Sequence, residues 1–173
     1  MNYFRLAEPE EVYSVARNMR KRDFEEIDAL RWSEGREELA QGLCNELGNF
    51  QNVFVCGDDD GPVAIVCYIP LRRGVWSLGL FATDSFQNIG SFLTKRIIRE
   101  IIPALDHGGA HRVECQSIVG YDQVHEWLEF LGLREECLLK GFGKNGEDFK
   151  TFSWVRDKAG HYGWDRGEIV NVH

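Results

Sequence analysis

The chain has 173 residues, 43% of them hydrophobic, and it carries a formal net charge of −8. This length and apolar content suffice for one domain with a sizeable hydrophobic core. The acidic balance offers no electrostatic footprint for nucleic acid, and no stretch is long and apolar enough to cross a bilayer. We therefore expect a single domain over residues 1–155, a polar C-terminal tail over residues 156–173, and neither a nucleic-acid nor a membrane partner.

The five cysteines are scattered, with neither a C-x-x-C motif nor a histidine at metal-ligand spacing. Their odd number and apolar neighbours favour buried free thiols in a reducing compartment. The first residues lack the apolar run of a signal peptide. The acidic run Asp58–Asp60 is interpreted as a solvated turn, because Ile69 stands where a calcium loop starting at Asp58 needs its last carboxylate. The sequence therefore predicts a soluble cytoplasmic protein without a metal site.

Apolar periodicity divides the chain into an N-terminal helical part and a longer part in which strands and helices alternate. A proline and acidic residues mark the start of the first helix after Glu8. Helices are expected over 8–19, 23–32, 36–47, 89 to about 103, and 122–130. Strands are expected over 3–6, 52–56, 63–69, 75–83, 112–119, 133–142 and 149–155.

The most informative stretch begins with the expected strand 75–83. Gly79 stands in the middle of it, where a glycine typically marks a bulge or a close approach of another backbone segment. The polar loop 84–88 then leads into a helix, whose first N–H groups lie at the positive end of the helix dipole. This order indicates a site suited to a phosphate-bearing ligand, and an ordinary strand-to-helix turn is the alternative interpretation.

The order of these elements resembles the GNAT fold of acetyl-coenzyme A-dependent N-acetyltransferases, over nearly the whole chain up to Val155. The segment Met19–Ile27 also resembles an opening found in GNAT-like proteins of tailed bacteriophages. Trp76–Thr83 resembles a strand of that phage group, which includes the internal virion protein A family of short-tailed phages. The resemblance implies an α+β (α/β) domain with a mixed, mostly antiparallel sheet of about six to seven strands and about four to five flanking helices. It also implies that the strands 75–83 and 112–119 splay apart.

In the GNAT fold, acetyl-coenzyme A lies between the two splayed strands. The resemblance implies that the first of them faces the pantetheine with its backbone, and that the following helix start holds the pyrophosphate. The family's Q/R-x-x-G-x-G/A loop is incomplete here, because only Gly90 remains and Phe92 stands where a tiny residue is expected. The cofactor-binding residues implied in this way are Leu80, Phe81, Ala82, Gln87, Asn88, Ile89, Gly90, Ser91 and Lys95.

The catalytic residues implied by the resemblance are less complete. Tyr121 aligns with an asparagine that many members carry, and Leu128 aligns with the tyrosine that protonates their leaving thiolate. Tyr121 is therefore the substitute acid that we consider. Glu114 is the candidate general base by its position on a strand, although its neighbours Arg112 and Gln116 favour a solvent-facing side.

Other chemistry-bearing residues have ordinary interpretations. Arg20, Asp23 and Glu26 share one helical face and are expected to pair with one another, with lining of the acceptor side of the cleft as the alternative. His125 is expected at the surface and Cys115 in the core. Packing roles are expected for Trp32, Trp76, Trp127 and Trp154.

Three functions are compatible with these features. The first is transfer of acetyl from acetyl-coenzyme A to a primary amine of an unidentified small-molecule or protein acceptor. The second is a catalytically silent GNAT-fold phage protein, with other virion proteins as partners, acting in assembly or inside the particle. The third is a coenzyme A-binding module that regulates a host protein. Fold alone does not choose among them.

Overall fold

The computed structural model describes residues 1–48 and 50–156, so the expected tail lies outside the described residues from 157 onward. The strands are β1 (Tyr3–Leu6), β2 (Val53–Asp58), β3 (Gly61–Arg72), β4 (Val75–Ala82), β5 (Arg112–Ile118), β6 (Arg134–Leu139) and β7 (Phe149–Val155). The helices are α1 (Pro9–Arg17), α2 (Lys21–Asp28), α3 (Arg36–Leu47), α4 (Gly90–Arg96), α5 (Ile102–His107) and α6 (Asp122–Phe130).

One seven-stranded sheet in the order β1-β2-β3-β4-β5-β7-β6 organises the molecule. Neighbouring strands are antiparallel except for β4 and β5, which run parallel. The mixed, mostly antiparallel sheet expected from the sequence is confirmed. The parallel pair is joined by a helical crossover made of α4 and α5, as parallel strands require.

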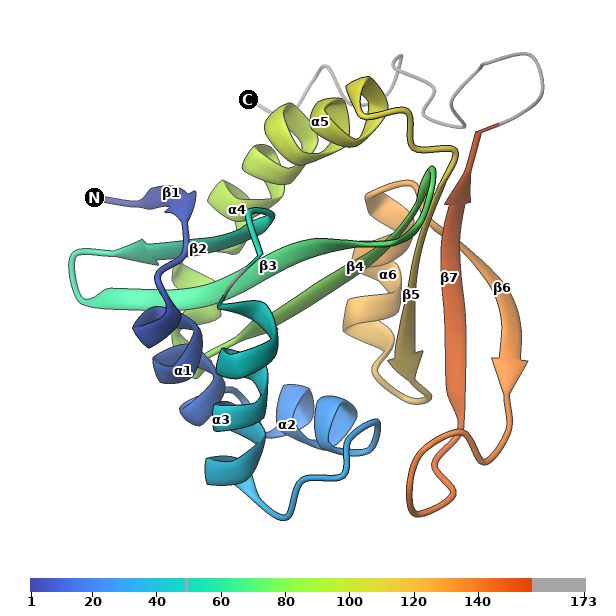
Figure 1. The fold of residues 1–173 in the computed structure, drawn as a ribbon, viewed down its shortest axis with the longest axis horizontal. Coiled ribbons are helices and arrows are strands. Elements are labelled where there is room, and N and C mark those ends of the chain that lie inside the picture. The colour runs from blue at the N-terminus through green and yellow to red at the C-terminus, as the bar shows by residue number, and fades with distance from the viewer. Residues whose placement is uncertain (49, 157–173) are drawn as a thin grey trace.

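The sheet splits between β4 and β5. These strands pair only from Val75–Ser77 with Arg112–Glu114, and beyond that point they diverge, as Figure 1 shows at the centre of the molecule. The predicted splay is therefore confirmed. A diverging pair leaves main-chain N–H and C=O groups on both facing edges without strand partners, and such groups need other acceptors and donors.

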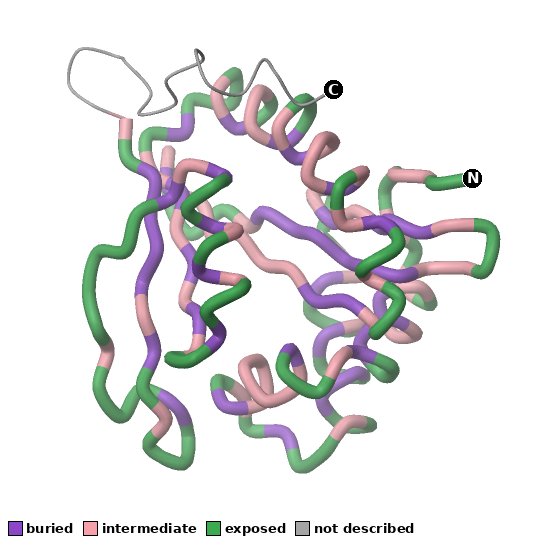
Figure 2. The backbone as a smooth tube through the Cα atoms, turned by 180° about the vertical axis from the view of Figure 1, so that it is seen from behind, coloured by how far each residue is buried: buried purple, intermediate pink, exposed green. Residues whose placement is uncertain are grey.

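Helices cover both faces of the sheet. α1 and α3 pack on one face around Val55 and Ile65, while α4, α5 and α6 pack on the other around Val66 and Phe152. In Figure 2 the central strands are largely buried and the edge strand β6 is exposed.

Several element boundaries differ from the expectation by a few residues, and two of the differences have consequences. α2 ends at Asp28, so Trp32 lies in the connection to α3 and is fully exposed, and the packing role expected for it is wrong. Once the chain leaves the helix, helical periodicity no longer determines which way a side chain points. The second helix of the crossover continues through Pro103, because a π-helical turn over Ile97–Ile101 precedes the proline and it occupies the first turn of α5.

At Gly79 the structure shows neither the bulge nor the close backbone approach that was expected, and the atom that comes close belongs to a side chain. The β3–β4 register runs without a shift from Ala64–Ala82 to Pro70–Trp76, so the bulge alternative is wrong. A Cβ atom on Gly79 would lie 3.0 Å from the Sγ atom of Cys67 on β3. Glycine therefore leaves room for the Cys67 side chain beside the split.

Candidate functional site

A cavity of about 520 Å³ passes through the sheet where β4 and β5 diverge. On one face it is lined by Val124, Trp127 and Leu128 of α6. On the other face it continues between the sheet and the helices α2 and α3, along Ile27 and Leu43. One space is thus lined by groups from both sides of the sheet, which allows two molecules to meet in it from opposite directions.

Helix α2 spans the open end of the split with two carboxylates. Asp23 accepts a hydrogen bond from the Ala82 N–H at the end of β4, at 2.8 Å. Glu26 accepts one from the Ile118 N–H at the end of β5, also at 2.8 Å. Each carboxylate therefore satisfies an edge N–H group that the splay leaves without a strand partner. α2 holds the two diverging strands at a defined separation and closes the window between them.

Asp23 is the centre of a buried network. Its carboxylate receives a bidentate ion pair from Arg20, with a nearest distance of 2.9 Å, and a hydrogen bond of 2.8 Å from the hydroxyl of Tyr121. The expected pairing of Arg20 with Asp23 is confirmed, and both also line the cavity. Burial and the negative charge of Asp23 raise the pKa of Tyr121. The phenol stays protonated and holds Asp23, an arrangement that suits positioning.

Glu26 differs from Asp23 in having one oxygen free. Its Oε2 atom accepts from both Ser117 Oγ, at 2.7 Å, and the Ile118 N–H. Within the described part of the chain, no side chain forms an ion pair with Glu26, so its expected pairing with Arg20 is wrong, and its Oε1 atom has no hydrogen-bond donor. Burial raises the pKa of this carboxyl above its ordinary value, and the bonds from Ser117 and Ile118 only partly oppose that effect.

Not all of the β4 backbone groups that the resemblance implies for pantetheine binding are free in the structure. Ala82 is already engaged, since its carbonyl accepts from the Arg20 N–H and its N–H donates to Asp23. Main-chain groups alternate sides along a strand, so those of Leu80 and Leu78 point to the same open edge as those of Ala82, and those of Phe81 point to β3. The Ser77–Glu114 pair of the parallel ladder uses the Leu78 N–H, so the unpaired groups at the split are the carbonyl of Leu78 and the N–H and carbonyl of Leu80.

The segment that was expected to bind phosphate is more ordered than the open loop that was expected. A 3-10 turn covers Asp84–Asn88, and the Ile89 N–H donates to the carbonyl of Phe86. The first intrahelical bond of α4 is made by Leu93, so the N–H groups of Gly90, Ser91 and Phe92 precede it. The side chains of Gln87, Asn88 and Ser91 are exposed, and that of Ile89 is fully buried.

Gly90 lies against an aromatic ring at this helix start. A Cβ atom there would stand 3.3 Å from the ring of Phe86, and the Arg20 guanidinium lies over the same ring. Phe86 lines the cavity, whereas Gly90 and Lys95 do not. The cavity therefore approaches the helix start along the Phe86 ring.

The two candidate catalytic residues lie in different surroundings. Tyr121 is buried and lines the cavity. Glu114 forms an ion pair with Arg112, which also bonds Glu136 on β6, and it is not among the residues that line the cavity. Leu128, at the position of the family's acid, is buried and lines the cavity. Sequence reasoning missed the free carboxylate oxygen of Glu26, for which its spacing from Asp23 was the available signal.

The positions expected for His125 and Cys115 have different outcomes. His125 is buried, with Nε2 3.2 Å from the Ile118 carbonyl and its ring against Phe152, so the expected surface position is wrong. It points inward because α6 turns that side toward the sheet. Cys115 is buried as expected, and burial raises the pKa of its thiol to about 12. The described residues contain neither a cluster of metal-binding side chains nor a helix able to span a membrane.

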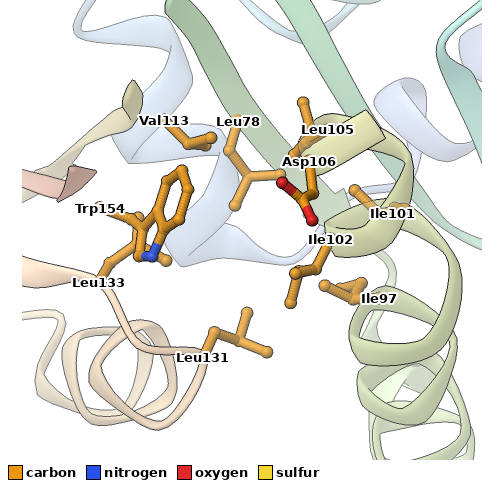
Figure 3. A pocket seen from close by; sticks show the side chains of 10 residues that line it. All are labelled: Leu78, Ile97, Ile101, Ile102, Leu105, Asp106, Val113, Leu131, Leu133 and Trp154. Carbon is orange, nitrogen blue, oxygen red and sulfur yellow. The ribbon is translucent and has the colours of Figure 1, made fainter. Parts of the chain in front are cut away.

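A second, smaller cavity of about 40 Å³ lies between the crossover helices and the sheet (Figure 3). Its lining is apolar except for Asp106, and the rings and branched side chains of Trp154, Ile101 and Val113 surround it. Leu78 lines both this cavity and the larger one. A space of this size exceeds a methyl group only slightly, so it represents imperfect packing behind the split.

Comparisons with solved structures identify the fold. Ard1 from Thermoplasma volcanium superimposes with a TM-score of 0.67 at 13% identity, covering 89% of this chain and 97% of that one. A ribosomal-protein-alanine N-acetyltransferase from Brucella melitensis gives 0.66 at 15% identity, covering 88% and 99%. An acetyltransferase of the GNAT family from Streptococcus pneumoniae gives 0.63 at 16% identity, covering 90% and 99%.

The chain therefore has the GNAT acetyltransferase fold. At these identities the likeness establishes the fold alone, and no protein-family model and no curated protein matches the sequence. The kinship with phage proteins suggested by Met19–Ile27 stays a prediction.

Proposed function

We propose that this protein is an acyl-coenzyme A-dependent N-acyltransferase that transfers acetyl from acetyl-coenzyme A to a primary amine. The observation that carries the proposal is the cavity that crosses the sheet at the split of β4 from β5. An acyl transfer needs the thioester and the amine in contact, shielded from water, and a passage lined from both faces of the sheet provides that geometry.

The unpaired edge of β4 fits the pantetheine arm. That arm carries amide groups, and the C=O group of Leu78 and the N–H and C=O groups of Leu80 are the backbone groups on the open edge with which they would pair. The N–H groups of Gly90, Ser91 and Phe92 are the donors on which a pyrophosphate would rest. Bound in this way, acetyl-coenzyme A supplies the acetyl group, and coenzyme A leaves as its thiolate.

Glu26 is the group that we assign as general base. Attack of the amine nitrogen forms the new C–N bond and breaks the C–S bond, and the amine then loses one proton. Glu26 lines the cavity and its Oε1 atom is free to accept that proton, and the raised pKa of this carboxyl brings its basicity nearer to neutrality. Tyr121 acts in this scheme through Asp23, by holding α2 and thus Glu26 in place.

A catalytically silent GNAT-fold protein is the second candidate. It is favoured by Leu128, an apolar side chain at the family's acid position, and by the Phe86 ring that packs against Gly90. In such a protein the cavity would be a remnant of the fold, and a role in a virion or as a coenzyme A-binding regulator would take the place of catalysis.

Calorimetric titration with acetyl-coenzyme A tests the cofactor site that the enzyme requires, and release of the coenzyme A thiol on addition of an amine then separates an enzyme from a coenzyme A-binding regulator. We expect binding in the micromolar range that is lost in Gly90→Val, because the added side chain clashes with Phe86 at the helix start. Gly42→Val is the matched control, since a Cβ on Gly42 of α3 meets no atom within 4 Å. Absence of binding at millimolar acetyl-coenzyme A would overturn the enzyme and leave the silent protein.

A further inference from the structure

The part of the cavity on the α2 and α3 side has an apolar wall. It is formed by Ile27 and Leu30 at α2, by Leu43 and Leu47 of α3, and by Ile69 of β3. Leu43 and Leu47 are almost completely buried, and Leu30 is partly exposed at the rim. A ligand that fills this part of the cavity removes apolar surface from water on both partners, which favours an acceptor with an apolar body.

The charged side chains that line the cavity leave a single uncompensated charge. They are Arg20, Asp23, Glu26, Arg31 and Glu46. Arg20 pairs with Asp23 at 2.9 Å, and Arg31 pairs with Glu46. Two cations and three carboxylates therefore leave one negative charge, on Glu26, which has no ion-pair partner among the described residues.

One carboxylate matches one amino group. A polyamine or an aminoglycoside would bring further ammonium groups against the apolar wall at Ile27 and Ile69, where the carboxylate of Glu46 is already paired with Arg31. Burying an unpaired charge costs several kcal/mol, so such polycations are disfavoured there. A single amine placed at Glu26, with the rest of the molecule apolar, meets both features of this half of the cavity.

The β6–β7 loop restricts the size of the acceptor. The Lys144 N–H donates to the carbonyl of Ala29 at 2.8 Å, and its Nζ atom pairs with Asp28 at 2.9 Å and donates to the carbonyl of Ser33. This residue ties the loop to the end of α2, beside the cavity. An extended polypeptide would have to displace these contacts to lie along α2, whereas a small molecule would not.

We infer that the acceptor is a small primary monoamine with an aliphatic or aromatic body, bound with its nitrogen at Glu26 and its body against the α2–α3 wall. The inference rests on the proposed function and specifies its second substrate. Peptide amino termini and polycationic amines are the acceptors that it disfavours.

A thiol-release assay with acetyl-coenzyme A tests the inference. The probes are hexylamine and phenethylamine, compared with spermidine, kanamycin and a short peptide that begins with leucine. We expect kcat/KM for the two monoamines to exceed that for the other three by about 100-fold, the scale on which apolar pockets discriminate. Faster transfer to spermidine, kanamycin or the peptide would overturn the acceptor class.

A variant pair locates the apolar wall. Leu71 lines the cavity at its rim and Leu138 on β6 lies outside it, and both are about half exposed. We expect Leu71→Lys to lower kcat/KM for hexylamine about 10-fold and Leu138→Lys to leave it unchanged, with equal calorimetric affinity for acetyl-coenzyme A in both. An equal effect of the two substitutions would contradict the assignment of the wall.

The outcomes separate this inference from the proposed function. If acetyl-coenzyme A binds and the acetyl group is transferred only to polycations or peptides, the inferred acceptor class is wrong and the proposed enzyme activity stands. If the protein binds no acetyl-coenzyme A, both the proposed function and the inferred acceptor class are wrong. Acetyl-coenzyme A that binds without transfer to any of the five amines also overturns the acceptor class proposed here.

Discussion

Asp23 and Glu26, one helical turn apart on α2, each accept the N–H group of a different strand across the split in the sheet. Asp23 binds Ala82 of β4, and Glu26 binds Ile118 of β5. The two carboxylates do different work, because Asp23 is neutralised by Arg20 whereas Glu26 keeps one oxygen free in the cavity. The first residue stabilises the split, and the second is placed for chemistry.

Replacement of Glu26 by glutamine is expected to lower kcat about 100-fold, since the amide keeps the bonds from Ser117 and Ile118 but accepts no proton. In the unmodified protein, kcat/KM rises with pH as the Glu26 carboxyl loses its proton, above the ordinary glutamate range because its pKa is raised. Glu26→Gln lacks this acidic limb. Kinetics across pH 4 to 9, taken as about the usable range, check both expectations.

Glu25→Gln is the matched control for that experiment. Glu25 lies next to Glu26 on α2 and forms exposed ion pairs with Lys21 and Arg22, outside the cavity lining. Its replacement should leave kcat and the acidic limb unchanged. A Glu26→Gln variant with full activity would exclude Glu26 as the base.

The same substitution is expected to change the pH dependence of stability. A carboxyl whose pKa is raised by folding binds more protons in the folded state, so its stabilising contribution is complete below the unfolded pKa and is lost as pH rises through the folded pKa. Glu26→Gln has no carboxyl to ionise, so it does not lose this stability as the pH rises. Urea denaturation should therefore show a variant that gains stability relative to the unmodified protein between pH 4 and pH 8, values chosen as about the two ends of that window.

If the unfolding free energies of Glu26→Gln and the unmodified protein differed equally at both pH values, burial would not destabilise the ionised form of Glu26. Stability lost to a functional carboxylate is a common feature of active sites, so this measurement also bears on the proposed function without any substrate.

Removal of the Asp23 carboxylate is expected to destabilise the protein strongly. Asp23→Ala leaves Arg20, the Ala82 N–H and the Tyr121 hydroxyl without their shared partner, and loss of one member of a buried pair costs about 3 kcal/mol. Tyr121→Phe removes only one hydrogen bond to that carboxylate and should cost about 1 kcal/mol. Chemical denaturation measures both.

Glu37→Ala provides the comparison for this pair of variants. Glu37 forms an ion pair with Arg17 at the surface, and its loss should leave the denaturation midpoint almost unchanged. A loss for Asp23→Ala no greater than that for Glu37→Ala would contradict the bridging role of α2.

Filling the small cavity is expected to stabilise the fold. Val113 lines the 40 Å³ space behind the split, so Val113→Ile places one more methyl group there and should add about 0.5 to 1 kcal/mol. Calorimetry should then show a Tm higher by about 2 °C. Val55→Ile, in the buried cluster on the other face, should give no gain because it lines neither cavity.

The fold followed from the sequence because most of its signals are local. Apolar periodicity gave the bounds of α3 and α6 as the structure has them, since each helix buries one face. The packing role predicted for Trp32 was wrong because α2 ends at Asp28, although the apolar spacing in the sequence continues beyond that residue. The helix break predicted at Pro103 was wrong for a similar reason, because a π-helical turn precedes the proline and the helix continues through it.

The candidate site was predictable only in outline. Its place at the end of β4 followed from the strand–loop–helix order, and the pairing of Arg20 with Asp23 followed from helical spacing. The role of Glu26 did not, because nothing near it in the chain reveals which group its carboxylate meets.

The sequence by itself determined the elements, their order and hence the sheet, because secondary structure depends on residues a few positions apart. Only the tertiary structure decided which carboxylate stays free. The bond from Ala82 to Asp23 joins residues 59 positions apart, and that from Ile118 to Glu26 joins residues 92 positions apart. Such contacts, and the desolvation that raises the pKa of Glu26, exist only once β4 and β5 have diverged and α2 has closed the gap between them.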